Sequence, residues 1–79
     1  MKKYKNKEMN EILCNRCGKK ILVERGIVKE GVYFAEMKWG YFSRKDGELH
    51  SFELCEECYD EMIESFLLPI EKKNIREYL

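Results

Sequence analysis

The clearest pattern of apolar and polar positions begins at residue 55 and has the period of a helix. From there to residue 67, apolar side chains recur at spacings of three and four, and polar or acidic side chains fill the positions between them. The apolar set is Cys55, Cys58, Tyr59, Met62, Ile63, Phe66 and Leu67. This pattern predicts an amphipathic helix with two cysteines at the start of its buried stripe. Pro69 either ends this helix or opens a short second one through Ile75 and Tyr78, and the pattern leaves both open.

A strand-like pattern precedes the helix, over residues 32–54. This stretch is rich in aromatic residues and is interrupted by the turn-forming residues 44–47, which predicts a β-hairpin. With these four residues as the loop, Trp39 lies opposite Phe52. The same register pairs Tyr41 with His50, Met37 with Leu54, and Lys38 with Glu53. A three-residue loop would instead place Trp39 opposite Glu53, so the sorting of side chains favours the four-residue loop.

This register also assigns the aromatic residues to the two faces of the hairpin. Trp39 and Phe52 share the face that we expect to pack against the helix. The helix residues expected there are Tyr59, Met62, Ile63 and Phe66. Phe42 and Leu49 turn to the other face and are expected to be exposed to solvent.

A second pair of cysteines lies before the hairpin, in the segment Cys14-Asn15-Arg16-Cys17, with apolar residues on both sides. Gly18 follows the pair. Such a turn often needs a positive φ after its second cysteine, so that backbone N–H groups can point at the sulfurs, and glycine adopts this conformation without steric cost. The segment therefore has the pattern of a zinc knuckle. Residues 24–31, with two glycines and mixed charge, are expected to connect it to the hairpin.

The two Cys-x-x-Cys pairs account for all four cysteines of the chain. Two such pairs are typical of a tetrahedral zinc site, and the alternatives are two disulfides or four unrelated buried thiols. The amino terminus lacks the pattern of a secretory signal, and no run of residues approaches membrane-spanning length. We therefore expect a reducing cytoplasm, which favours metal over disulfide. The predicted ligands of one structural zinc ion per chain are Cys14, Cys17, Cys55 and Cys58.

At 79 residues the chain corresponds to one small domain, whose apolar core alone would contribute about 3–5 kcal/mol. Metal binding contributes roughly 10–16 kcal/mol in small metal-held domains, so the metal-free chain is expected to be largely unfolded. Residues 1–10 are basic and have no clear apolar period. We expect them to form a mobile tail, and residues 11–79 to form a single zinc-binding domain.

The formal net charge is zero, but the charges are unevenly distributed. Residues 1–20 hold seven Lys or Arg and two Glu, whereas residues 53–64 hold six carboxylates and no basic residue. Four thiolates around a zinc ion add about two further negative charges near the second segment. The chain as a whole lacks the basic excess that usually marks a nucleic-acid-binding protein.

The order of a knuckle, a hairpin and a helix that starts with a second Cys-x-x-Cys resembles a treble-clef zinc finger. The segments Cys14–Lys20 and Leu54–Tyr59 also resemble those of small four-cysteine zinc proteins of Gram-positive bacteria and their phages. This resemblance spans residues 12–68 and implies a small metal-stabilised α+β domain of the treble-clef-like or zinc-ribbon-like kind. The spacer between the pairs exceeds the roughly 15–20 residues of simple ribbons, which leaves room for an elaborated sheet.

Rubredoxin, an iron electron carrier, is a further resemblance, because it also holds one metal with two Cys-x-x-Cys loops. The present chain departs from it at the second loop, where Tyr59 and a helix replace a glycine-bearing knuckle. Zinc is therefore favoured over iron, although a site of four thiolates can hold either metal.

An enzyme is not expected, because four thiolates saturate zinc and leave no open position for water or a small-molecule substrate. His50, the single histidine, is expected to be a half-buried hairpin residue and not a base. Two binding functions remain. A protein-binding adaptor or regulator would use exposed apolar residues such as Phe42 and Leu49, with the acidic helix face, on a protein partner or on a second copy in a homodimer.

The alternative is a nucleic-acid-binding regulator that places basic side chains against phosphates. Its candidate residues are Lys2, Lys3, Lys5, Lys7, Arg16, Lys19 and Lys20. Neutral overall charge and the acidic helix favour the protein-binding interpretation, because phosphate contacts need clustered cations without opposing carboxylates.

Overall fold

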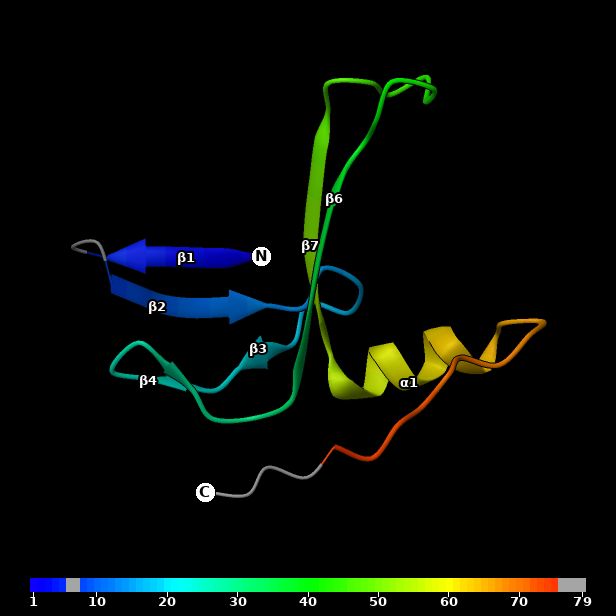
Figure 1. Ribbon diagram of the computed structural model, residues 1–79. Coiled ribbons are helices and arrows are strands. Elements are labelled where there is room, and N and C mark those ends of the chain that lie inside the picture. Colours follow the sequence, from blue (N-terminus) through cyan, green and yellow to red (C-terminus); the bar gives the residue numbers. More distant parts are fainter. Residues whose placement is uncertain (6–7, 76–79) are drawn as a thin grey trace.

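The computed structural model describes residues 1–5 and 8–75, which form a small α+β fold of β-hairpins and one carboxyl-terminal helix (Figure 1). The elements in chain order are β1 (Lys2–Lys5), β2 (Glu8–Leu13), β3 (Lys20–Ile21), β4 (Val23–Glu24), β5 (Ile27–Val28), β6 (Val32–Lys38), β7 (Leu49–Cys55) and α1 (Glu56–Glu64). The strands of these described residues form three antiparallel sheets, in the orders β1-β2-β3, β4-β5 and β6-β7.

The apolar core is small and lies where these sheets and the helix meet. Its buried aliphatic residues are Ile12 from β2, Ile21 from β3 and Leu54 from β7. Burying each of them contributes about 1.5–3 kcal/mol. The remaining buried members of the core cluster are three of the four cysteines, namely Cys14, Cys55 and Cys58. The core and the cysteine cluster are therefore one continuous structure.

The molecule is more extended than a compact domain of its length. Its Cα radius of gyration is 15.4 Å, whereas about 12 Å is expected for a compact chain of this length. Figure 1 shows the reason: the β6-β7 hairpin projects away from the rest, with β1 to β4 on one side of its base and α1 on the other. Only the base of the hairpin contributes to the core.

The amino-terminal segment differs from the tail expected for residues 1–10. Lys2–Lys5 form β1, which pairs with β2 in an antiparallel register that sets Lys2 opposite Ile12 and Lys3 opposite Glu11. The boundary expected between residues 10 and 11 therefore falls inside β2. An apolar period is not needed here, because β1 is an exposed strand held by backbone pairing to β2.

The hairpin register differs from the predicted one by four residues. Phe52 lies opposite Ala35, and Leu54 opposite Tyr33, so the loop spans residues 39–48 and not 44–47. Hydrogen bonds between residues 40 and 43, 43 and 46, and 45 and 48 fold this loop into consecutive turns. Because a shift of four residues preserves the alternation of faces, the predicted sorting of side chains between the faces still holds.

The shift changes what Trp39 contacts. Tyr33 occupies the position near α1 that the predicted register gave to Met37, and its ring lies 4.9 Å from that of Tyr59. Trp39 lies farther out along the hairpin, partly buried, with its ring 5.8 Å from that of His50 and the Lys45 ammonium 4.3 Å from its centroid. The expected packing of Trp39 on the helix is therefore replaced by packing of Tyr33.

The helix is shorter than its apolar pattern. It ends at Glu64, and Ser65 caps it, because its hydroxyl donates a hydrogen bond of 2.6 Å to the carbonyl of Met62. Phe66 and Leu67, which continue the pattern, are 46% and 95% exposed. No helix follows Pro69 in the described residues up to 75, and Tyr78 lies outside them.

Candidate metal centre

The first cysteine pair lies in a tight turn between β2 and β3. The Gly18 N–H donates to the carbonyl of Cys14 at 2.9 Å, and Gly18 has a φ of +81°, which confirms the conformation expected at this glycine. The Cys17 N–H points at the Cys14 sulfur at 3.5 Å, and the Lys19 N–H points at the Cys17 sulfur at 3.4 Å. The turn therefore surrounds two sulfurs with backbone donors.

The second pair spans the junction of β7 and α1. Cys55 is the last residue of the strand and the N-cap of the helix, and its side chain makes no capping hydrogen bond. Cys58 lies one turn later and is the buried residue of α1. Helix N-termini favour negative charge, which suits thiolates and also the acidic residues Glu56 and Glu57 of the first turn.

The fold brings all four predicted cysteines together. Their sulfur atoms lie within 4.8 Å of one another, and those of Cys17 and Cys55 are 3.7 Å apart. Four sulfurs at about 2.3 Å from a tetrahedral zinc ion would be separated by about 3.8 Å. The cysteines are free thiols and form no disulfide with one another. These four residues are thus positioned to bind a metal ion.

The protonation of the cluster shows why it suits a cation. Burial acts to raise the pKa of Cys14, but hydrogen bonds from the backbone N–H groups of Cys17, Cys55 and Arg16 outweigh it and lower this pKa from 9.0 to about 6. Burial raises the pKa of Cys58 to about 12; the neighbouring thiols add to this effect, and a hydrogen bond from Arg16 opposes it. A positive charge within the cluster would oppose the effect of burial on Cys58 and favour its thiolate form.

Arg16, inside the first Cys-x-x-Cys, reaches the second half of the centre. Its guanidinium donates to the Glu61 carboxylate on α1 at 3.0 Å. Hydrogen bonds to Cys58 and to Glu61, in that order of effect, raise the pKa of Arg16. The side chain therefore connects the knuckle to the helix and places a positive charge beside the sulfurs.

Asn15, the other residue between these cysteines, is held to β7, and Lys19 after the turn is held to the connection that follows. The Asn15 N–H donates to the carbonyl of Glu53 at 2.8 Å, and the Lys19 ammonium lies 3.0 Å from the Glu30 carboxylate. A supporting role for Asn15 or Lys19 was not predicted from the sequence. Their roles depend on contacts across about 40 residues of chain or on loop geometry, and no local pattern signals them.

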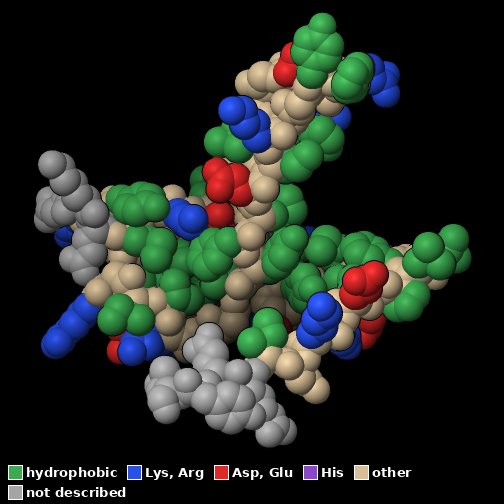
Figure 2. Space-filling model, in the orientation of Figure 1, with side chains coloured by type: hydrophobic (Ala, Val, Ile, Leu, Met, Phe, Trp, Pro, Cys, Tyr) green, Lys and Arg blue, Asp and Glu red, His purple; other side chains and the backbone are tan. Residues whose placement is uncertain are grey.

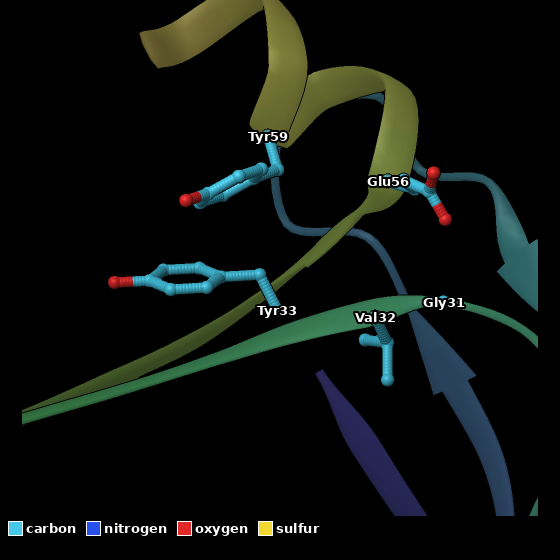
Figure 3. A pocket seen from close by; sticks show the side chains of 5 residues that line it. All are labelled: Gly31, Val32, Tyr33, Glu56 and Tyr59. Carbon is cyan, nitrogen blue, oxygen red and sulfur yellow. The ribbon is translucent and has the colours of Figure 1, made fainter. Parts of the chain in front are cut away.

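A shallow pocket of about 230 Å³ lies beside the centre, where α1 meets the start of β6 (Figure 3). Figure 3 shows the rings of Tyr33 and Tyr59 lying one over the other, with Glu56 on the other side of the pocket near Gly31. A Cβ at position 31 would meet the carboxylate end of the flexible Glu56 side chain, which would have to turn aside. The arrangement is one of packing: it fixes α1, and with it Cys58, against the hairpin.

The contacts of His50 are with other residues of the hairpin and not with the four cysteines. Its Nε2 atom is 3.0 Å from a Glu48 carboxylate oxygen, and its ring packs edge-on against Trp39. Within the described part of the chain, the cluster that could hold a metal ion consists of the four cysteines and does not include His50. His50 is also more exposed than the half-buried position expected for it.

Comparison with known protein families, with curated proteins and with solved structures finds no significant match to this chain. Within residues 1–5 and 8–75, no helix has the length and apolar character needed to cross a bilayer.

Proposed function

We propose that this chain is a structural zinc-binding interaction module that binds a protein partner through the outer end of its β6-β7 hairpin. The zinc ion would be coordinated by Cys14, Cys17, Cys55 and Cys58 and would have no open position for chemistry, so we propose no enzymatic activity. The treble-clef-like class is the fold that we propose. A knuckle, a hairpin and a helix that begins with the second cysteine pair support it.

The observation that carries the proposal is the exposed apolar end of the hairpin. Phe42 is 98% exposed and Tyr41 83%, and their rings contact each other edge-to-face at 5.3 Å. Leu49, across the mouth of the loop, is also exposed, so the expected exposure of Phe42 and Leu49 is confirmed. Figure 2 shows hydrophobic side chains at the far end of the projecting hairpin, next to basic and acidic ones. Exposed aromatic residues grouped in this way are typical of binding surfaces.

Ion pairs within the described residues weaken the nucleic-acid alternative. Three of its candidate cations lie near carboxylates: Arg16 near Glu61, Lys19 near Glu30 and Lys2 near Glu53. Each such pair reduces the positive charge available to a phosphate backbone. Lys7, another candidate, lies outside the described residues.

The test is capture of partners from the native cell by zinc-loaded protein, followed by direct binding measurements on each protein captured. We expect a partner that binds the wild type and is lost with Phe42→Ser. Leu67→Ser is the matched control, because Leu67 is 95% exposed on the segment after α1 and its removal should leave binding unchanged. Equal binding by Phe42→Ser and Leu67→Ser would contradict the proposal.

Random-sequence DNA is the second ligand to test. Tight binding that falls steeply with salt and is abolished by Lys19→Glu with Lys20→Glu would establish the nucleic-acid alternative instead.

An iron site, as in the rubredoxin-like alternative, would appear as stoichiometric iron with redox activity in protein isolated from the native cell.

A further inference from the structure

The β6 edge of the projecting hairpin has no strand beside it among the described residues. The sheet consists of β6 and β7 alone. The opposite edge is occupied near the base, where Asn15 bonds both the N–H and the carbonyl of Glu53. Two-stranded sheets have marginal stability by themselves, and an unpaired edge is a template for another strand.

The direction of the free backbone groups on β6 follows from the register. Trp39 donates its N–H to the carbonyl of Glu48 at 3.0 Å, which makes this a hydrogen-bonded pair. Since such pairs alternate along an antiparallel ladder, the residues at odd positions of β6 bond to β7. The N–H and carbonyl groups of Glu36 and Lys38 therefore point to the open edge.

Along this edge, in the segment Ala35-Glu36-Met37-Lys38-Trp39, side chains of opposite charge flank Met37. Within the hairpin, Glu36 lies opposite Ser51 and Lys38 opposite Leu49, so neither has a cross-strand partner of opposite charge. The ion pairs among the described residues include neither of them. The strand thus presents an acid and a base, two residues apart, that its own sheet does not pair.

We infer that β6 is a homodimerisation edge, onto which a second copy of this chain adds its own β6 in antiparallel orientation about a twofold axis at Met37. In this register Glu36 of each copy lies opposite Lys38 of the other, which gives two symmetric pairs of opposite charge. Ala35 lies opposite the second copy's Trp39, and the outward backbone groups of Glu36 and Lys38 meet as hydrogen-bonded pairs.

Neighbouring registers lack this complementarity. An axis at Glu36 would set the two Glu36 carboxylates directly opposite each other, which is destabilising. An axis at Ala35 would set Glu36 opposite Phe34 and Lys38 opposite Val32, and would leave all the charges unpaired. Charge and hydrogen-bond direction together therefore select the axis at Met37.

In this register the two cysteine-containing bodies lie far apart. Met37 lies five residues from the start of β6, about 17 Å along the strand, so antiparallel pairing places the two cysteine-containing bodies at opposite ends. The joined four-stranded sheet would also extend the apolar face of each hairpin. That face now contains 51% exposed Met37 and a pocket of about 420 Å³, whose lining includes Trp39 and Phe52.

Charge reversal tests the pairing and its register in zinc-loaded protein, by sedimentation equilibrium between about 10 µM and 1 mM. The wild type is expected to dimerise. Glu36→Lys and Lys38→Glu should each weaken the dimer about tenfold or more, because each turns two attractive pairs into repulsive ones. An equimolar mixture of the two variants should recover a heterodimer, and the double variant Glu36→Lys with Lys38→Glu should recover a homodimer.

Glu64→Lys on α1 and Lys29→Glu before β6 are the matched charge controls, and they should dimerise like the wild type. The inference is overturned if the wild type remains monomeric up to about 1 mM. That result is expected if this edge binds a strand of a different protein. The inference is equally overturned if the single variants dimerise normally, or if mixing them restores nothing. Phe42→Ser leaves residues 35–39 unchanged and should still dimerise, so this test and that of the proposed function can fail separately.

Discussion

Asn15 and Glu53 are joined by a reciprocal pair of hydrogen bonds. The Asn15 N–H donates to the Glu53 carbonyl at 2.8 Å, and the Glu53 N–H donates to the Asn15 side-chain oxygen at 3.0 Å. Asn15 follows Cys14 directly, and Glu53 precedes Cys55 by two residues. The asparagine thus takes the place of a neighbouring strand and aligns the two halves of the metal centre.

Asn15→Ala should lower the free energy of unfolding of the zinc-loaded protein by about 1–3 kcal/mol, because it leaves the partly buried Glu53 N–H without an acceptor. Thermal or chemical unfolding measures this difference. The control is Asn10→Ala in β2, an exposed position for which a change within about 0.5 kcal/mol is expected. Equal stability of the two variants would show that the reciprocal pair contributes nothing.

Removal of the metal should unfold the chain. Among the described residues the buried aliphatic side chains are Ile12, Ile21 and Leu54, and a core of this size cannot offset the conformational entropy of the folded backbone. We expect a strong chelator, or Cys55→Ser, to abolish cooperative unfolding, and elemental analysis of the wild type to give one zinc per chain. Ser51→Ala in the same strand should leave both properties intact. A metal-free chain that keeps native near-ultraviolet circular dichroism would refute this prediction.

Arg16→Ala should reduce metal affinity by more than the loss of its exposed ion pair explains. The Arg16–Glu61 ion pair is exposed and contributes at most about 1 kcal/mol, whereas loss of a group that supports metal ligands typically lowers affinity about 10- to 100-fold. Competition with a chromophoric chelator measures the affinity, and Arg44→Ala in the hairpin loop controls for loss of a positive charge. If Arg16→Ala and Arg44→Ala retain zinc equally well, Arg16 has no role in metal binding.

Trp39→Ala should cost about 1–2 kcal/mol, less than the roughly 3–5 kcal/mol of a fully buried tryptophan, because its ring is partly exposed and packs on His50 and Lys45. Tyr33→Ala, which removes the contact with Tyr59 on the helix, should cost more. The reverse order, measured by chemical unfolding, would mean that the hairpin adopts the register in which Trp39 reaches the helix.

The features predicted correctly from the sequence are those with local causes. The amphipathic period located α1, the need for a positive φ identified Gly18, and the Cys-x-x-Cys spacing identified the four residues that converge. The alternation of side chains predicted the two faces of the hairpin correctly but not its register. A shift of four residues leaves every side chain on the same face, so the alternation cannot distinguish the two registers. No local pattern signalled β1, because it is held by backbone pairing to β2 and by ion pairs of the Met1 amino group and Lys2 with the distant Glu53.

The placement of Trp39 makes it a separate optical probe of the hairpin. It is the single tryptophan of the chain, and it lies on the projecting hairpin, in contact with Lys45 and His50 and not with the cysteines. Its emission therefore follows opening or pairing of the hairpin, whereas thiolate-to-metal absorption in a cobalt-substituted protein follows the centre. Because the outer hairpin has few contacts with the core, the two signals are expected to change at different denaturant concentrations, and the hairpin should open first.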